Sequence, residues 1–70
     1  MTKQTGQRVK ILSGMKEFVG QIGTIIDNTE RDGRTTMYRV QLDKPIQVPG
    51  VGTVQDDLWA GTYLRNVRSQ

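Results

Sequence analysis

Turn-forming residues recur along this chain so often that they leave no room for a long helix. Ser13-Gly14, residues 28–36 and residues 49–52 are rich in turn-forming types, and Pro45 adds a further break. Glycine adopts positive φ, proline fixes φ, and asparagine and aspartate bond to their own backbone, so all four favour turns. Only short extended segments fit between these positions. The sequence therefore predicts an all-β chain.

Apolar and polar residues alternate in the segments between the turns. In residues 37–42, the side chains of Tyr38, Val40 and Leu42 share one face, which we expect to be buried. A period of two is the pattern of a strand with one buried face. We expect five strands, at residues 8–12, 22–26, 37–42, 51–55 and 63–67.

A single turn of 3-10 helix fits just before the last expected strand. Residues 56–60 have room for it, and Asp56 or Asp57 would cap it. Five short strands with one such turn are the layout of a small SH3-like barrel. We expect the barrel at residues 6–67, with a disordered N-terminus at residues 1–5 and a frayed C-terminus at residues 68–70.

Length and composition limit what can stabilise the chain. It has 70 residues, and a domain of this size buries only about 60% of its unfolded surface. It contains neither cysteine nor histidine, so disulfides and the common zinc sites cannot add to a thin core. We therefore expect no metal and no cofactor, and we expect binding to a protein partner or self-association as a homo-oligomer.

The hydropathy pattern points to a cytoplasmic protein. The first residues lack the apolar core of a signal peptide, and no stretch approaches the roughly 18 apolar residues of a membrane span. Ten basic residues against seven acidic ones give a net charge of +3, with the two signs interspersed. A mixed, solvated surface is the simplest interpretation of that balance.

Residue types that carry catalysis are scarce. The usual general base and thiolate nucleophile are missing, and Ser13 and Ser69 are the only serines. Asp56 and Asp57 could act as an acid and base pair or hold a hard cation, but adjacent residues of an extended chain point in opposite directions. Capping and solvation explain them more simply. We expect no catalytic residue and a protein that is not an enzyme.

Three basic residues are candidates for binding. Alternation places Arg8, Lys10 and Arg39 on the outward faces of the first and third expected strands. They would attract an acidic protein partner or the phosphates of a nucleic acid. A nucleic-acid interface usually adds aromatic stacking platforms, and this chain has only four aromatic residues. Protein binding is favoured, and nucleic-acid binding remains an alternative.

The aromatic residues near the C-terminus have two interpretations. Trp59, the only tryptophan, is either a core residue over one open end of the barrel or an exposed anchor for a partner. We expect Tyr63 in the core, as part of the closing strand. The polar segment 27–36 is either a plain hairpin tip or a contact surface.

Two residue patterns resemble the SH3-like barrels grouped as electron-transport accessory proteins. The first is Gly6-x-Arg8-Val9-Lys10-x-Leu12 followed by Gly20-x-x-Gly23-Thr24-Ile25, which resembles the opening of the photosystem I subunit that helps dock ferredoxin. The second is Tyr38-Arg39-Val40-x-Leu42-Asp43 followed by Val54-x-x-Asp57-Leu58-Trp59-x-x-x-Tyr63-Leu64, which is similar to the C-terminal barrel of the nitrile hydratase β subunit. The resemblance implies a small accessory module. KOW modules share much of the first pattern, which supports the nucleic-acid alternative.

A third resemblance is to the type II plasmid dihydrofolate reductase. Gly20-Gln21-Ile22 and Val54-Gln55 look like its landmarks, and the resemblance implies a homotetramer that binds NADPH and dihydrofolate in a central pore. The family's pore segment Val-Gln-Ile-Tyr-Pro is replaced here by Val54-Gln55-Asp56-Asp57-Leu58. Its pore lysine aligns with Ile11, and Lys10 should face the other side of the strand. A reductase-like tetramer with degenerate pore residues is therefore the first alternative.

The sequence thus predicts a non-enzymatic SH3-like binding or accessory module, and its brevity with the reductase resemblance suggests a stand-alone protein of a mobile element. The candidate binding residues are Arg8, Lys10, Arg39, Gln55, Asp56, Asp57 and Trp59.

Overall fold

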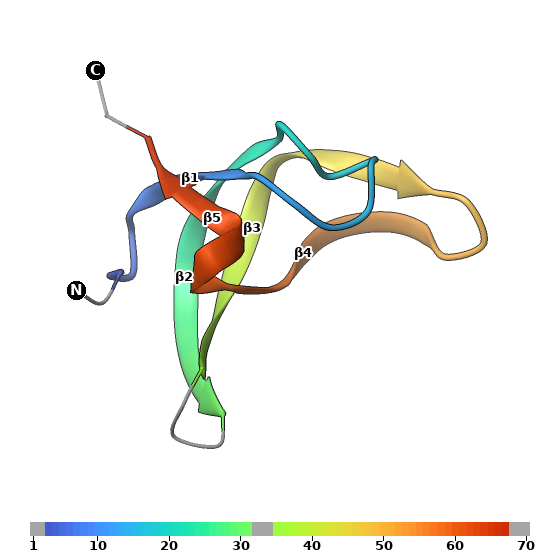
Figure 1. Cartoon of the computed structure of the whole chain (residues 1–70). Helices are drawn as coiled ribbons and strands as arrows, with labels where there is room; N and C mark the ends of the chain where they lie inside the picture. The colour runs from blue at the N-terminus through green and yellow to red at the C-terminus, as the bar shows by residue number, and fades with distance from the viewer. Residues whose placement is uncertain (1–2, 32–34, 68–70) are drawn as a thin grey trace.

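A computed structural model describes residues 3–31 and 35–67, apart from the side chains of residues 29–31 and 35. Its elements are β1 (Arg8–Ile11), β2 (Ile22–Arg31), β3 (Thr35–Val48), β4 (Gly52–Ala60), the 3-10 helix η1 (Gly61–Tyr63) and β5 (Leu64–Asn66). All strand pairs are antiparallel, in the order β4-β3-β2-β1-β5. Figure 1 shows the long β2 and β3 bending strongly, while β5 returns to lie beside β1. The predicted five-stranded SH3-like fold, with one 3-10 turn before the last strand, is confirmed.

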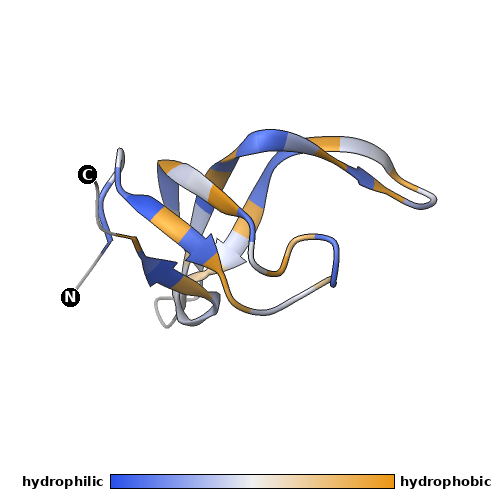
Figure 2. Ribbon diagram, turned by 90° about the horizontal axis from the view of Figure 1, so that it is seen from above, coloured by the Kyte–Doolittle hydropathy of each residue, from blue (hydrophilic) through white to orange (hydrophobic). Residues whose placement is uncertain are grey.

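Alternation along the strands separates a core face from an outer face. In β1, Val9 and Ile11 are completely buried, whereas Lys10 is exposed between them. The hydropathy colours of Figure 2 change in the same way along the strands. Lys10 therefore faces away from Ile11, as the sequence predicts.

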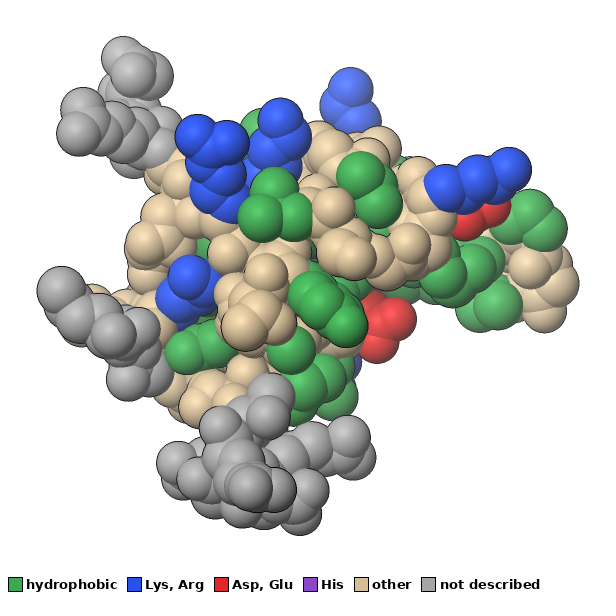
Figure 3. Space-filling model, viewed as in Figure 1, with side chains coloured by type: hydrophobic (Ala, Val, Ile, Leu, Met, Phe, Trp, Pro, Cys, Tyr) green, Lys and Arg blue, Asp and Glu red, His purple; other side chains and the backbone are tan. Residues whose placement is uncertain are grey.

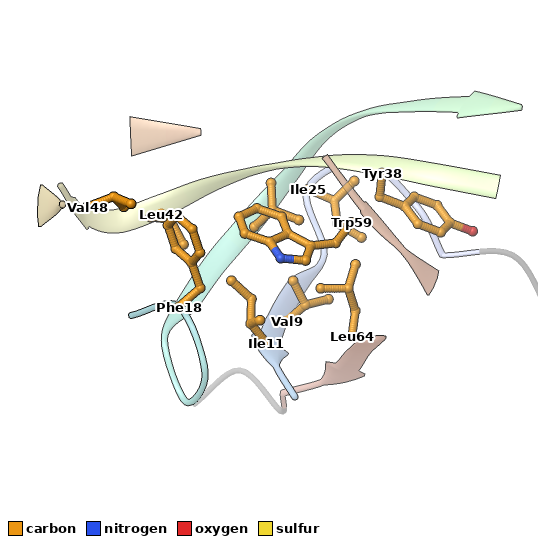
Figure 4. Packing of buried hydrophobic residues seen from close by; sticks show 10 residues of the cluster. Val9, Ile11, Phe18, Ile25, Tyr38, Leu42, Val48, Trp59 and Leu64 are labelled. Carbon is orange, nitrogen blue, oxygen red and sulfur yellow. The ribbon is translucent and has the colours of Figure 1, made fainter. Parts of the chain in front are cut away.

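The core consists of one cluster of buried apolar residues around Trp59. Its members are Val9, Ile11, Phe18, Ile25, Tyr38, Val40, Leu42, Val48, Trp59 and Leu64. Figure 4 shows the indole of Trp59 in the middle of this cluster. The rings of Phe18 and Trp59 meet edge to face, with centroids 5.4 Å apart. The structure confirms the core interpretation of Trp59, and also the buried face of Tyr38, Val40 and Leu42.

Gly23 lies where β2 is crowded by β3. A Cβ atom on Gly23 would lie 2.5 Å from the carbonyl oxygen of Gln41 and 2.7 Å from Cγ1 of Val40. Only glycine fits such a close approach of two backbones.

The 3-10 helix lies further along the chain than residues 56–60. Asp56 and Asp57 belong to β4, where they pair with Gln41 and Val40, and the ladder continues to the pair of Ala60 with Met37. Backbone pairing with β3 therefore outweighs capping, and no side chain caps η1. The predicted position of the 3-10 turn and the capping roles of Asp56 and Asp57 were wrong.

Tyr63 was also placed wrongly by the sequence pattern. It is the last residue of η1 and its side chain is 44% exposed. The buried residue at this point of the chain is Leu64, the first residue of β5. The closing strand is therefore one residue shorter at each end than residues 63–67.

Several strands run beyond their predicted ends. β2 extends to Arg31 and β3 starts at Thr35, because polar residues on both sides pair across the hairpin. β3 continues through Pro45, which sits at a register shift between Gln41 and Ile46 where a missing N–H is tolerated. β4 begins at Gly52, and Val51 at the preceding turn is 70% exposed.

The chain ends were expected to be disordered. Residues 1–2 and 68–70 lie outside the described part of the chain, as do residues 32–34 at the tip of the polar hairpin. The backbone N–H of Lys3 donates a hydrogen bond of 3.1 Å to the hydroxyl of Tyr38. The domain bounds 6–67 and the disorder of residues 1–5 and 68–70 therefore stay predictions.

Candidate functional site

Arg8 lies in β1 and reaches across β2 to Asp43 of β3. Its Nη1 donates to Asp43 Oδ1 at 2.7 Å and its Nη2 to Oδ2 at 2.6 Å. Nη1 also donates to Thr24 Oγ1 at 3.1 Å. The hydrogen bonds from Arg8 lower the pKa of Asp43, although partial desolvation opposes them. The charge of Arg8 is therefore balanced within the molecule.

Arg39 lies two strands away from β1 and also has a carboxylate neighbour. Its Nη1 is 3.7 Å from Asp56 Oδ2 of β4. β2 separates β3 from β1, and two interstrand spacings amount to about 10 Å. The structure therefore does not gather Arg8, Lys10 and Arg39 into one uncompensated basic face.

Lys10 instead has a basic neighbour that the sequence analysis did not select. It is the direct cross-strand partner of Arg65 in β5, and both side chains are exposed. A shallow depression of about 490 Å³ is lined by Lys10, Arg65, Asn66 and Val67. Figure 3 shows Lys and Arg side chains gathered where β1 and β5 lie. We call these four lining residues the basic surface.

Arg65 could have been found from the alternation in the last strand. Leu64 is buried and Arg65 is exposed, which is the period-two pattern already used for β1. What the pattern lacks is the register that sets Arg65 opposite Lys10. The register depends on the position of η1, which joins β4 directly to β5.

The acidic segment of β4 lies at the opposite edge of the sheet. Gln55, Asp56 and Asp57 are all exposed. Asp56 pairs with the exposed Gln41 and Asp57 with the buried Val40, so the two carboxylates lie on opposite faces, as predicted. Asp57 Oδ1 accepts a hydrogen bond from the N–H of Leu58 at 2.8 Å. Within the described residues, no three Asp or Glu side chains come together to hold a metal ion.

The aromatic residues offer little for stacking. Phe18, Tyr38 and Trp59 are buried, and only Tyr63 is partly exposed. The binding-anchor interpretation of Trp59 is therefore wrong, since a side chain 6% exposed presents almost no surface. Among the described residues, the single helical element is η1, so none could cross a membrane as a helix.

Comparison with known proteins gives no relative. No family model, curated protein or solved structure matches the chain.

Proposed function

We propose that the protein is a non-enzymatic binding module whose basic surface holds an acidic segment of a partner protein. The observation that carries the proposal is the cross-strand pair of Lys10 and Arg65, two like charges directly opposite each other. Among the described residues, none that lines the depression they share is acidic. Arg8 and Arg39, by contrast, each lie beside a carboxylate.

A bound carboxylate would relieve an unfavourable arrangement. Like charges directly opposite each other on neighbouring strands destabilise a sheet. An anion between Lys10 and Arg65 replaces that repulsion by attraction, and the planar guanidinium of Arg65 can donate two parallel hydrogen bonds to a carboxylate. Exposure of both side chains favours fast, electrostatically steered association.

The distribution of aromatic side chains favours protein over nucleic acid. Binding to single strands relies on exposed aromatic rings on which bases stack. Three of the four aromatic residues are buried here, and Tyr63 is not among the residues that line the depression. The phosphate backbone would also meet the exposed carboxylates of Asp56 and Asp57 elsewhere on the molecule.

The test is a fluorescence anisotropy titration with a labelled hexapeptide, Glu-Thr-Glu-Thr-Glu-Thr, at about 150 mM salt, where screening acts over about 8 Å. The variant Lys10→Glu/Arg65→Glu should bind at least about tenfold more weakly, a loss of about 1.4 kcal/mol, because it replaces two attractive charges by two repulsive ones. The matched control Lys16→Glu/Lys44→Glu makes the same change in net charge at two other exposed lysines.

The control separates a local site from general attraction. We expect the Lys16→Glu/Lys44→Glu variant to stay close to the wild-type affinity. Equal losses in both double variants would contradict the proposal, because binding would then follow net charge alone. Tighter binding of a short DNA duplex than of the peptide would contradict it as well.

A further inference from the structure

β5 forms one edge of the sheet, and β1 is its only neighbour among the described strands. Two backbone bonds flank their ladder: Leu12 N to Tyr63 O at 2.8 Å and Val67 N to Arg8 O at 2.9 Å. Hydrogen-bonded and non-hydrogen-bonded pairs alternate in an antiparallel ladder. Arg65 and Lys10 therefore exchange backbone hydrogen bonds. The backbone N–H and C=O groups of Leu64 and Asn66, on either side of Arg65, point away from β1.

Three backbone groups on this edge consequently have no bonding partner among residues 3–31 and 35–67. The N–H of Leu64 donates to the carbonyl of Gly61, which closes η1. The carbonyl of Leu64 and both the N–H and the carbonyl of Asn66 point away from β1, because these two residues occupy the non-hydrogen-bonded positions. A free strand edge of this kind is a template for pairing with another chain.

The other edge of the sheet, β4, is protected against the same event. Asp57 accepts the N–H of Leu58, the group that another strand would need. Exposed carboxylates of Asp56 and Asp57 would repel an acidic segment there. The carboxylates of β4 therefore disfavour the addition of an acidic strand there, whereas the exposed Arg65 of β5 attracts one.

We propose that the acidic segment of the partner protein binds to β5 as an added β-strand. This inference rests on the proposed function of the basic surface. The residue opposite Asn66 would exchange two backbone hydrogen bonds with it, and a third bond would reach the carbonyl of Leu64. The two flanking residues of the segment would then place their side chains on the outer face, next to Arg65, while the long side chain of Lys10 would have to reach them across β5. The fitting partner is an extended segment with acidic residues at every second position.

The order of residues in the peptide gives a first test. Glu-Thr-Glu-Thr-Glu-Thr places its three carboxylates on one face of a strand, whereas Glu-Glu-Glu-Thr-Thr-Thr has the same composition but divides them between two faces. Strand addition predicts several-fold tighter binding of the alternating peptide. Equal affinities would overturn it.

Backbone substitution gives the second test. Asn66→Pro removes the outward N–H but keeps the ladder with β1, a position at which edge strands tolerate proline. Asn66→Ala keeps the N–H and is the matched control. We expect Asn66→Pro to bind at least about tenfold more weakly than Asn66→Ala, a difference of about 1.4 kcal/mol, because both variants lack the asparagine side chain and only Asn66→Pro lacks the N–H. Should Asn66→Pro fail to fold, N-methylation of alternate peptide residues removes the same bonds from the partner's side, with the wild-type protein.

The outcomes separate the two proposals. Binding that is lost in Lys10→Glu/Arg65→Glu but unaffected by Asn66→Pro and N-methylation would overturn strand addition while the proposed function stands. Absence of binding to either peptide would overturn both. Self-association that disappears in Lys10→Glu/Arg65→Glu would make a second copy of the chain the occupant, which also overturns the inference.

Discussion

Arg8 and Asp43 form a bidentate ion pair across the width of β2, with nitrogen to oxygen distances of 2.7 and 2.6 Å. This contact joins β1 to β3, two strands that do not share backbone hydrogen bonds. Both side chains remain about two-fifths exposed, at 39% and 43%, so solvent weakens the attraction. The pair adds a modest cross-link to a small sheet and leaves Lys10 as the cation of β1 without such a partner among the described residues.

The ion pair predicts a specific pH dependence of stability. Arg8 holds the pKa of Asp43 below that of an ordinary aspartate. A carboxylate with a lowered folded pKa stabilises the fold above its unfolded pKa, and this contribution is lost as the pH falls through the folded value. Asp43→Asn should therefore have a lower Tm than wild type at neutral pH and the same Tm in strong acid. Thermal unfolding followed by circular dichroism at a series of pH values measures this difference.

The control is the double variant Arg8→Gln/Asp43→Asn. It should show the same pH profile as Asp43→Asn, because the pair is already broken in the single variant. A constant difference in Tm between wild type and Asp43→Asn across the whole pH range would contradict the predicted role of the pair.

Replacing Gly23 should destabilise the sheet where β2 approaches β3. The new Cβ of Gly23→Ala would lie 2.5 Å from the Gln41 carbonyl oxygen, and a backbone atom cannot move aside as a side chain can. Overpacking of this kind costs about 1–3 kcal/mol. Gly61→Ala is the matched control, since its Cβ would meet only the ring of Tyr38 at 3.1 Å. Urea denaturation should show a larger loss for Gly23→Ala, and equal losses would contradict the account.

The contact of Phe18 with Trp59 should contribute beyond the burial of each ring. Edge-to-face aromatic pairs contribute about 0.5–1.5 kcal/mol in addition to area. A double-mutant cycle with Phe18→Leu and Trp59→Leu, measured by urea denaturation, should give a coupling energy in that range. Additive effects of the two substitutions would show that the contact between the rings contributes nothing beyond the burial of each ring.

Tyr38 should link the first described residues to the body of the molecule. Its hydroxyl accepts a hydrogen bond from the N–H of Lys3. Tyr38→Phe keeps the buried ring and removes only this acceptor, so we expect a loss of about 0.5–1.5 kcal/mol in the free energy of unfolding. Hydrogen exchange should also show faster exchange at the Lys3 amide. Unchanged exchange there would argue against the contact.

The sequence predicts the fold class because the pattern in the strands is local. Alternation identifies Val9, Ile11, Val40 and Leu42 as buried, and the structure agrees. The ends of the strands are predicted less well, since they depend on pairing with distant residues. Asp56 and Asp57 resemble helix caps in isolation, but pairing with Gln41 and Val40 extends β4 through them.

The candidate site is predictable only where it depends on local alternation, and not where it depends on the pairing of distant strands. The side of β1 on which Lys10 lies follows from alternation alone. Its partner Arg65 follows only from the register of β1 with β5, which the sequence pattern does not contain. The charges of Arg8 and Arg39 were recognised, but their carboxylate neighbours lie on other strands, 35 positions from Arg8 in the case of Asp43.

The most direct test of the basic surface is an NMR titration of the labelled protein with the peptide Glu-Thr-Glu-Thr-Glu-Thr, following each backbone amide. The account predicts that the largest shift changes fall on Lys10, Arg65 and Asn66, with small changes at Arg39, Asp56 and the turn around Val51. Changes concentrated on the Arg39 and Asp56 face, or no changes at all, would contradict the claim that the surface shared by β1 and β5 is the binding site.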